Sequence, residues 1–167
     1  MGIITDRDTA KNKLTSLLQP SSYPTLSTGE GGEVETLLDD NRIGSVWAQS
    51  TSYEIGDVVI PTAENRTGLR YRLASFDGEG VQSGASEPAW PIKTGSTVSD
   101  GNLIWEEDGP ECDLWDIMQA AYEGWLLKQS KAVNNIDYKD ASASFSASQI
   151  SRHCADMAEK YKPVRFA

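Results

Sequence analysis

The chain has 167 residues, with 25 acidic and 15 basic side chains and a formal net charge of −10. This length predicts one domain, or one small domain with a sizeable insertion. The acidic balance argues against a protein that grips nucleic acid through its phosphates, although it suits a surface past which DNA slides. No apolar run approaches the roughly 20 residues of a membrane span, and the polar N-terminus is not typical of a secretory signal.

Two short helices are predicted in the first 45 residues. The first runs from Thr5, its expected N-cap, to Gln19, with Asp8 completing a capping box and Pro20 ending it. The second runs over Glu33–Asn41. Their apolar faces comprise Leu14, Leu17, Leu18, Val34, Leu37 and Leu38. Neither helix can bury its own face, so both are expected to pack on another element.

Residues 46–110 are predicted to form a small all-β module, because the helical period disappears there and turn residues become dense. The expected strands are Tyr53–Ile60, Leu69–Ala74 and Leu103–Glu106. This segment holds four basic and ten acidic side chains, a net charge of −6. Its aromatic residues could form the core of the module or a row facing solvent, and they include Trp47, Tyr53, Tyr71, Trp90 and Trp105.

The longest helical pattern runs from Asp113, an expected N-cap, to Lys131. Its wide apolar stripe consists of Leu114, Ile117, Met118, Ala121, Tyr122, Trp125 and Leu126. Gly124 lies inside this helix at a cost of about 1 kcal/mol relative to alanine. Gly124 and Trp125 are therefore predicted to serve helix packing, with the glycine admitting a second backbone.

A last helix is predicted from Ser146, which forms a capping box with Gln149, up to Pro163. Its apolar face comprises Ile150, Cys154, Met157, Ala158 and Tyr161. The chain then ends in a basic and apolar tail, in which Arg165 and Phe166 are residue types enriched at protein interfaces.

Together these elements predict an α+β fold in which a small bundle of about four helices carries an all-β domain inserted between the second and third helices. The helical domain would comprise residues 1–45 and 111–167, and the inserted module residues 46–110.

Residues capable of chemistry are few. His153 and Cys154 are adjacent, so on a helix their side chains point about 100° apart, which does not suit a nucleophile pair. The acidic run 106–108 lacks the spacing of a calcium loop and is interpreted as a solvated turn. Two distant cysteines and one histidine fit neither a disulfide framework nor a zinc site. The sequence thus predicts no catalytic residue, no cofactor site, no metal site and no enzymatic activity.

One set of residues has a spacing more specific than the apolar periodicity of an ordinary helix. It comprises Ala120, Ala121, Glu123, Gly124, Trp125, Lys128, Phe145, Ser148, Gln149, His153, Cys154, Met157, Ala158 and Tyr161. Together with the opening stretch PTLSTGEGGEVETLLDD, this pattern resembles the bacteriophage head-to-tail adaptor proteins. It departs from that family at Ser130, Lys131 and Ala147. Residues 46–110, with Gly56, Asp57 and other turn formers, resemble a small β module of phage virion proteins and more faintly chitin-binding modules.

The resemblance implies a structural head-completion protein of the virion neck, assembled in the host cytoplasm. It would form a homo-oligomeric ring, twelve-fold by family resemblance, beneath the portal, and would also contact a tail-side neck or stopper protein. DNA would pass through its channel without specific binding, and no membrane would be involved. The tail, Lys162, Pro163, Val164, Arg165 and Phe166, would dock on the portal. The alternative is a carbohydrate- or host-surface-binding virion protein that acts through its aromatic module.

Overall fold

The computed structural model describes residues 3–134 and 147–163. The described residues divide into two compact units. The sheet unit comprises residues 3–5 and Ile43–Leu114, and the helical unit comprises Asp6–Arg42, 115–134 and 147–163. Of the helices that the structure describes, none combines the length and the apolarity that a membrane span requires.

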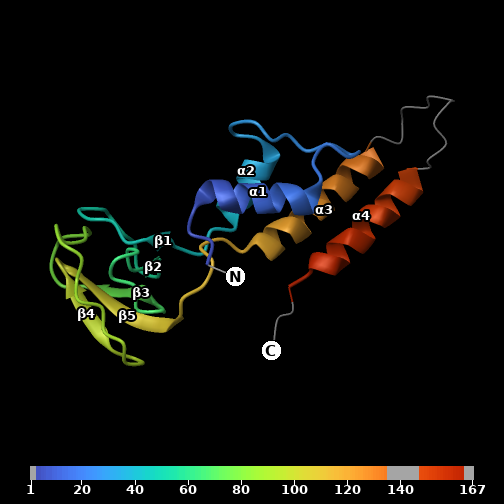
Figure 1. Ribbon diagram of the computed structural model, residues 1–167. Coiled ribbons are helices and arrows are strands. Elements are labelled where there is room, and N and C mark those ends of the chain that lie inside the picture. The colour runs from blue at the N-terminus through green and yellow to red at the C-terminus, as the bar shows by residue number, and fades with distance from the viewer. Residues whose placement is uncertain (1–2, 135–146, 164–167) are drawn as a thin grey trace. The chain divides into compact units, whose positions relative to one another are not determined.

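The helical unit is built around α3 (Ile117–Asn134), which packs against α1 (Arg7–Leu18), α2 (Glu33–Asp40) and α4 (Ala147–Tyr161). Figure 1 shows α3 between α4 on one side and α1 with α2 on the other. The two N-terminal helices therefore pack on the long helix, which buries the apolar faces that neither short helix can bury alone. Their buried side chains are Ala10, Leu14, Leu18, Val34 and Leu38.

Two of the predicted N-caps are wrong. Helix α1 is capped by Asp6, whose carboxylate accepts a 2.8 Å hydrogen bond from Thr9 N. Thr5 precedes this cap, because the aspartate side chain already satisfies the first-turn amide. Helix α3 begins at Ile117, and the preceding residue, Asp116, caps it by accepting a 2.9 Å hydrogen bond from Gln119 N.

Asp113, the predicted cap of the long helix, has another role. Its Oδ1 accepts a 2.7 Å hydrogen bond from Ile4 N, and Leu114 N donates to Ile4 O at 3.1 Å. These bonds fix residues 3–5 to the end of the strand region, which explains why the first residues belong to the sheet unit. The predicted cap of the last helix, Ser146, lies outside the described residues.

The sheet unit holds a five-stranded sheet in the order β1-β2-β3-β5-β4. The strands are β1 (Ser45–Val46), β2 (Val58–Ile60), β3 (Leu69–Phe76), β4 (Thr97–Asp100) and β5 (Leu103–Pro110). β1 runs parallel to β2 and the other pairs are antiparallel, so the sheet is mixed.

The predicted strand Tyr53–Ile60 is shortened to its last three residues. Its first half is a turn, in which Glu54 N donates to Asp57 Oδ2 at 2.8 Å and Asp57 N donates to Glu54 O at 3.0 Å. Gly56 adopts φ 98°, a left-handed conformation that favours glycine. β1 and β4 have two and four residues, too few to produce a readable alternation.

The predicted fold class, a helical bundle carrying an inserted all-β domain, is wrong. The described residues form an α+β structure, with four helices towards the two ends of the chain and a five-stranded mixed sheet in the middle. Within the helical unit, α3 contacts α4 on one side and α1 and α2 on the other. Residues 3–5 contribute to the sheet unit, so the strand region is completed by a segment that precedes the first helix.

Candidate interaction surfaces

The aromatic residues of the sheet unit form its core. Trp47, Tyr53, Tyr71, Trp90 and Trp105 are all at most 8% exposed. The rings contact one another, with centroids 4.4 Å apart for Tyr71 and Trp90 and 5.1 Å apart for Tyr53 and Trp105. Of the two roles that the sequence left open, a solvent-facing row and a core, the structure places these rings in the core.

A buried carboxylate holds two of these tryptophans in place. Asp100, 2% exposed, accepts hydrogen bonds through Oδ2 from the indole nitrogens of Trp47 at 2.7 Å and Trp105 at 3.1 Å. Its Oδ1 accepts a 2.7 Å bond from Gly84 N. Three N–H donors thus converge on one side chain in the middle of the core, and no local sequence pattern identifies Asp100 as their acceptor.

The acidic run after Trp105 is not the solvated turn that was predicted. Glu107 is buried on β5 and accepts hydrogen bonds from Gly95 N at 2.9 Å and Gly109 N at 2.8 Å. Asp108 forms ion pairs with Arg70 and Arg72 at 3.0 and 3.1 Å. Hydrogen bonding to Arg72 holds the pKa of Asp108 below its ordinary value of 3.8. These acids therefore stabilise the sheet unit itself.

In the helical unit, Gly124 allows two other helices to approach α3 closely. A Cβ atom at this position would lie 2.5 Å from a methyl group of Leu18 and 3.1 Å from one of Leu37. Trp125 is 2% exposed, and its indole nitrogen has no hydrogen-bond partner among the described residues. Both residues thus lie at contacts between α3 and its neighbours.

Lys128 is a fully buried cation, and its position near the end of the predicted helix does not indicate this burial. Its Nζ donates to Gln19 O at 2.8 Å, to Ser22 O at 3.1 Å and to Ser22 Oγ at 2.8 Å. It also lies 4.8 Å from the centre of the Trp125 ring. Burial lowers the pKa of this ammonium group. Lys128 therefore closes the C-terminal end of α1 against α3.

The predicted inward stripe of α3 is wider than the surface that its neighbours cover. Trp125 and Ala121 are buried, whereas Met118 is 46% and Leu126 38% exposed. The half-buried Tyr122 lies between Met118 and Leu126 on the same face of the helix. Val133, seven residues beyond Leu126, is 48% exposed on this face. We call Met118, Tyr122, Leu126 and Val133 the outer face of α3.

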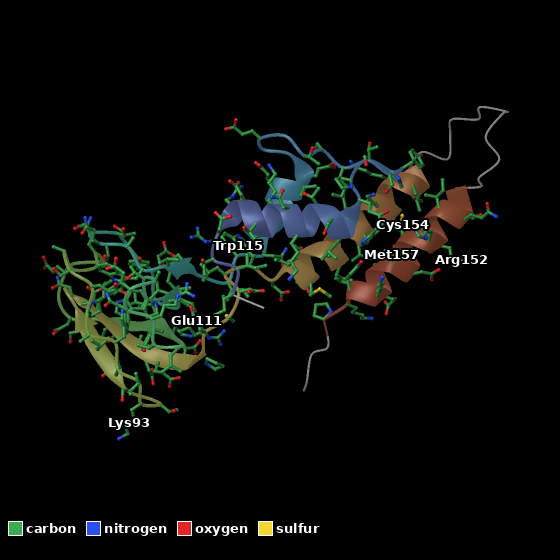
Figure 2. The ribbon with its side chains drawn as sticks, in the orientation of Figure 1. Lys93, Glu111, Trp115, Arg152, Cys154 and Met157 are labelled. Atoms are coloured by element: carbon green, nitrogen blue, oxygen red, sulfur yellow. The ribbon has the colours of Figure 1, made fainter. Side chains whose placement is uncertain are left out.

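The residues considered for chemistry on α4 point to different environments. His153 is exposed and its ring lies edge-on to Trp125, 5.8 Å between centroids. Cys154 is buried, which raises the pKa of its thiol, while Arg152 on the same helix faces solvent (Figure 2). Within the described residues, no cluster of histidine, cysteine, aspartate or glutamate has the arrangement of a metal site.

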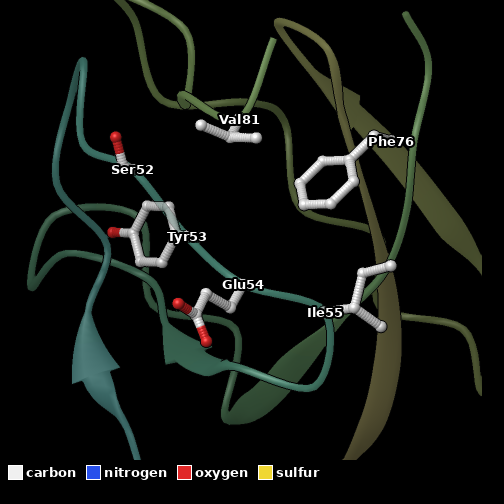
Figure 3. A pocket seen from close by; sticks show the side chains of 6 residues that line it. All are labelled: Ser52, Tyr53, Glu54, Ile55, Phe76 and Val81. Atoms are coloured by element: carbon white, nitrogen blue, oxygen red, sulfur yellow. The ribbon is translucent and has the colours of Figure 1, made fainter. Parts of the chain in front are cut away.

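A groove of about 510 Å³ opens on the sheet unit. The sheet-unit groove is lined by Ser52, Tyr53, Glu54, Ile55, Phe76 and Val81 (Figure 3). Four of these residues come from the turn before β2, one from the end of β3 and one from the following loop. The sequence does not predict the groove, because most of its wall is a turn and a loop that carry no periodic pattern.

Of the tail residues predicted to dock on the portal, Lys162 and Pro163 are described, and Val164, Arg165 and Phe166 lie outside the described residues. Lys162 pairs with Glu159 at 3.1 Å on the last turn of α4. Comparison of the chain with protein-family models, curated proteins and solved structures found no match.

Proposed function

We propose that the protein is a structural, ring-forming head-to-tail adaptor of a bacteriophage neck, located between the portal and the tail-side components. The observation that carries this proposal is the outer face of α3. Met118, Leu126 and Val133 expose large apolar side chains in a line along one helix. Apolar side chains in contiguous rows are typical of surfaces that another protein covers.

A second copy of the chain is the proposed cover. In a ring, each subunit presents one surface to the neighbour on its left and a different surface to the neighbour on its right. The outer face of α3 would be one of these two surfaces. Burial of this face would stabilise the assembled subunit by about 25 cal/mol for each Å² of apolar area removed from water. A small domain with a modest core gains relatively much from such stabilisation.

The charge supports a role around DNA without specific binding. The net charge of −10 would repel phosphates from the channel wall and let the duplex move through it. The basic and apolar segment 162–167 is proposed to dock on the portal, because it differs in charge from the acidic body and carries interface residue types. In the particle, the protein would be assigned to the virion neck.

The alternative is a carbohydrate- or host-surface-binding virion protein. Sugar rings stack on aromatic side chains that face solvent, and the five aromatic side chains of the sheet unit are at most 8% exposed. This burial favours the adaptor proposal. Binding to a glycan array at micromolar concentration would favour the alternative.

The experiment is a mass measurement of the purified chain in solution, together with the variants Leu126→Glu and Met118→Glu. The proposal expects a closed oligomer for the unaltered chain and its dissociation in both variants, because each places a charge in an apolar interface. Gln149→Glu, an exposed position on α4 with the same change of charge, is the matched control and should assemble normally. A chain that stays monomeric at high concentration contradicts the proposal.

A further inference from the structure

We propose that the sheet-unit groove binds an extended segment of a partner protein in which an apolar side chain stands next to a lysine or an arginine. This inference concerns the sheet unit alone and does not rest on the proposed ring. It follows from three properties of the groove: its exposed apolar walls, its uncompensated negative charge and its fixed backbone.

The walls of the groove are apolar and open to solvent. Ile55 is 64% exposed and Val81 46% exposed, although both side chains line a concave surface. Phe76 and Tyr53 are the two other apolar side chains of the wall (Figure 3). A volume of about 510 Å³ lies within the range of roughly 300–1,000 Å³ that is typical of binding pockets. The groove can therefore hold apolar side chains that its own chain does not supply.

The charge at the groove is negative. Glu54 is exposed on the wall, and none of the ion pairs in the described part of the chain involves it. The arginines of the sheet unit are already engaged elsewhere. Arg70 and Arg72 pair with Asp108, and Arg66 Nη1 lies 2.8 Å from Glu111 Oε1. A cationic ligand is thus the electrostatic complement of the groove.

The groove is preformed. Tyr53 N donates to Val81 O at 3.0 Å, which joins the two walls, and Ser52 forms an isolated antiparallel bridge with Gln82. Gly56 N donates to Leu73 O at 2.9 Å and fixes the turn to β3. A site whose backbone is already fixed loses little conformational freedom when a ligand enters, so a short segment can bind it.

The polar groups of the groove favour a peptide over a sugar. The Tyr53 hydroxyl already accepts a 3.0 Å hydrogen bond from Ala48 N, and its ring is 6% exposed. Ser52 and Glu54 are the remaining side chains on the wall that can bond to a ligand. Two polar side chains beside aliphatic walls suit one cation and its apolar neighbour, whereas a sugar needs many hydrogen bonds and an open aromatic face.

The test is a titration of the full-length protein with the peptide acetyl-Gly-Lys-Phe-Arg-Leu-Gly-amide, followed through the methyl NMR signals of Ile55 and Val81. The control peptide replaces both basic residues by glutamate. We expect saturable shifts with the basic peptide alone. Glu54→Gln should weaken binding by about two- to fivefold, as expected for an exposed charge pair. Ile55→Ser should weaken it about tenfold.

Matched variants separate the groove from general surface effects. Glu64→Gln removes an exposed carboxylate elsewhere on the sheet unit, and Ile92→Ser removes an apolar side chain that is 79% exposed outside the groove. Both should bind the basic peptide normally. Equal binding of the acidic peptide, no saturation at millimolar peptide, or saturable binding of a soluble N-acetylglucosamine oligomer at the same methyl groups would each overturn the proposal.

Discussion

Replacing Asp100 should show how strongly one buried carboxylate holds the sheet unit together. Asp100→Ala removes the acceptor of three N–H groups, the indoles of Trp47 and Trp105 and the amide of Gly84, which lie 2.7–3.1 Å from its oxygens. Leaving a buried donor without an acceptor costs about 1–3 kcal/mol. Three such donors give a loss of about 3–9 kcal/mol, and water entering the cavity would bring the loss towards the lower figure.

Asp100→Asn provides a graded comparison. An asparagine oxygen can still accept from the two indoles, but its amide group then meets Gly84 N, a donor facing a donor. One lost hydrogen bond should therefore cost about 1–3 kcal/mol, less than the alanine variant. The exposed Glu79→Ala is the matched control and should change stability by less than about 0.5 kcal/mol.

Urea unfolding is the assay, with circular dichroism at a helical wavelength reporting the helical unit. Tryptophan fluorescence reports both units, with three of the five tryptophans in the sheet unit and two, Trp115 and Trp125, in the helical unit. Asp100→Ala should lower the midpoint of the fluorescence transition by an amount equivalent to at least about 3 kcal/mol. If the loss is below about 1 kcal/mol, the three hydrogen bonds do not determine the stability of the core.

Three further outcomes are expected from the helical unit. Gly124→Leu should lower stability by about 2–3 kcal/mol in urea unfolding, since its side chain must displace Leu18; unchanged stability would contradict the close packing. Lys128→Met should lose about 2 kcal/mol by removing the hydrogen bonds that the ammonium group donates to Gln19 and Ser22. A gain in stability would mean that burying the ammonium costs more than these hydrogen bonds return. Because the hydrogen bond from Lys131 holds the pKa of Glu33 below its ordinary value of 4.5, that stabilisation is present above this pH and is lost as the pH falls through the lower folded value. Thermal midpoints measured between about pH 6 and pH 3 should therefore fall, and a midpoint that rises would contradict this sign.

Periodicity was sufficient to locate the helices, because each buries one face along several turns. The predicted second helix ends within one residue of Glu33–Asp40. The first residue of a helix was less predictable where several neighbouring residues could serve as its N-cap. Asp6 and Asp116 are the caps, and the nearby Thr5 and Asp113 were chosen because sequence shows which residues can cap a helix but not which side chain reaches the amide.

The candidate surfaces could be predicted only in part. The wide apolar arc of α3 was readable, but whether Met118 and Leu126 face a neighbour or solvent depends on where the other helices lie. The bonds that Lys128 makes to Gln19 and Ser22 join residues more than 100 positions apart, and no local pattern encodes them. The sheet-unit groove likewise depends on the approach of two loops that are separated in sequence.

The molecular mass of the chain in solution decides whether the outer face of α3 is an interface between subunits. We expect a closed ring whose mass is a whole multiple, greater than two, of the 18.2 kDa subunit. We also expect that Leu126→Glu reduces this mass to that of one subunit, while the helical circular dichroism signal stays unchanged. A monomer or a dimer at all concentrations, or a ring that Leu126→Glu leaves intact, would contradict assembly through the outer face of α3.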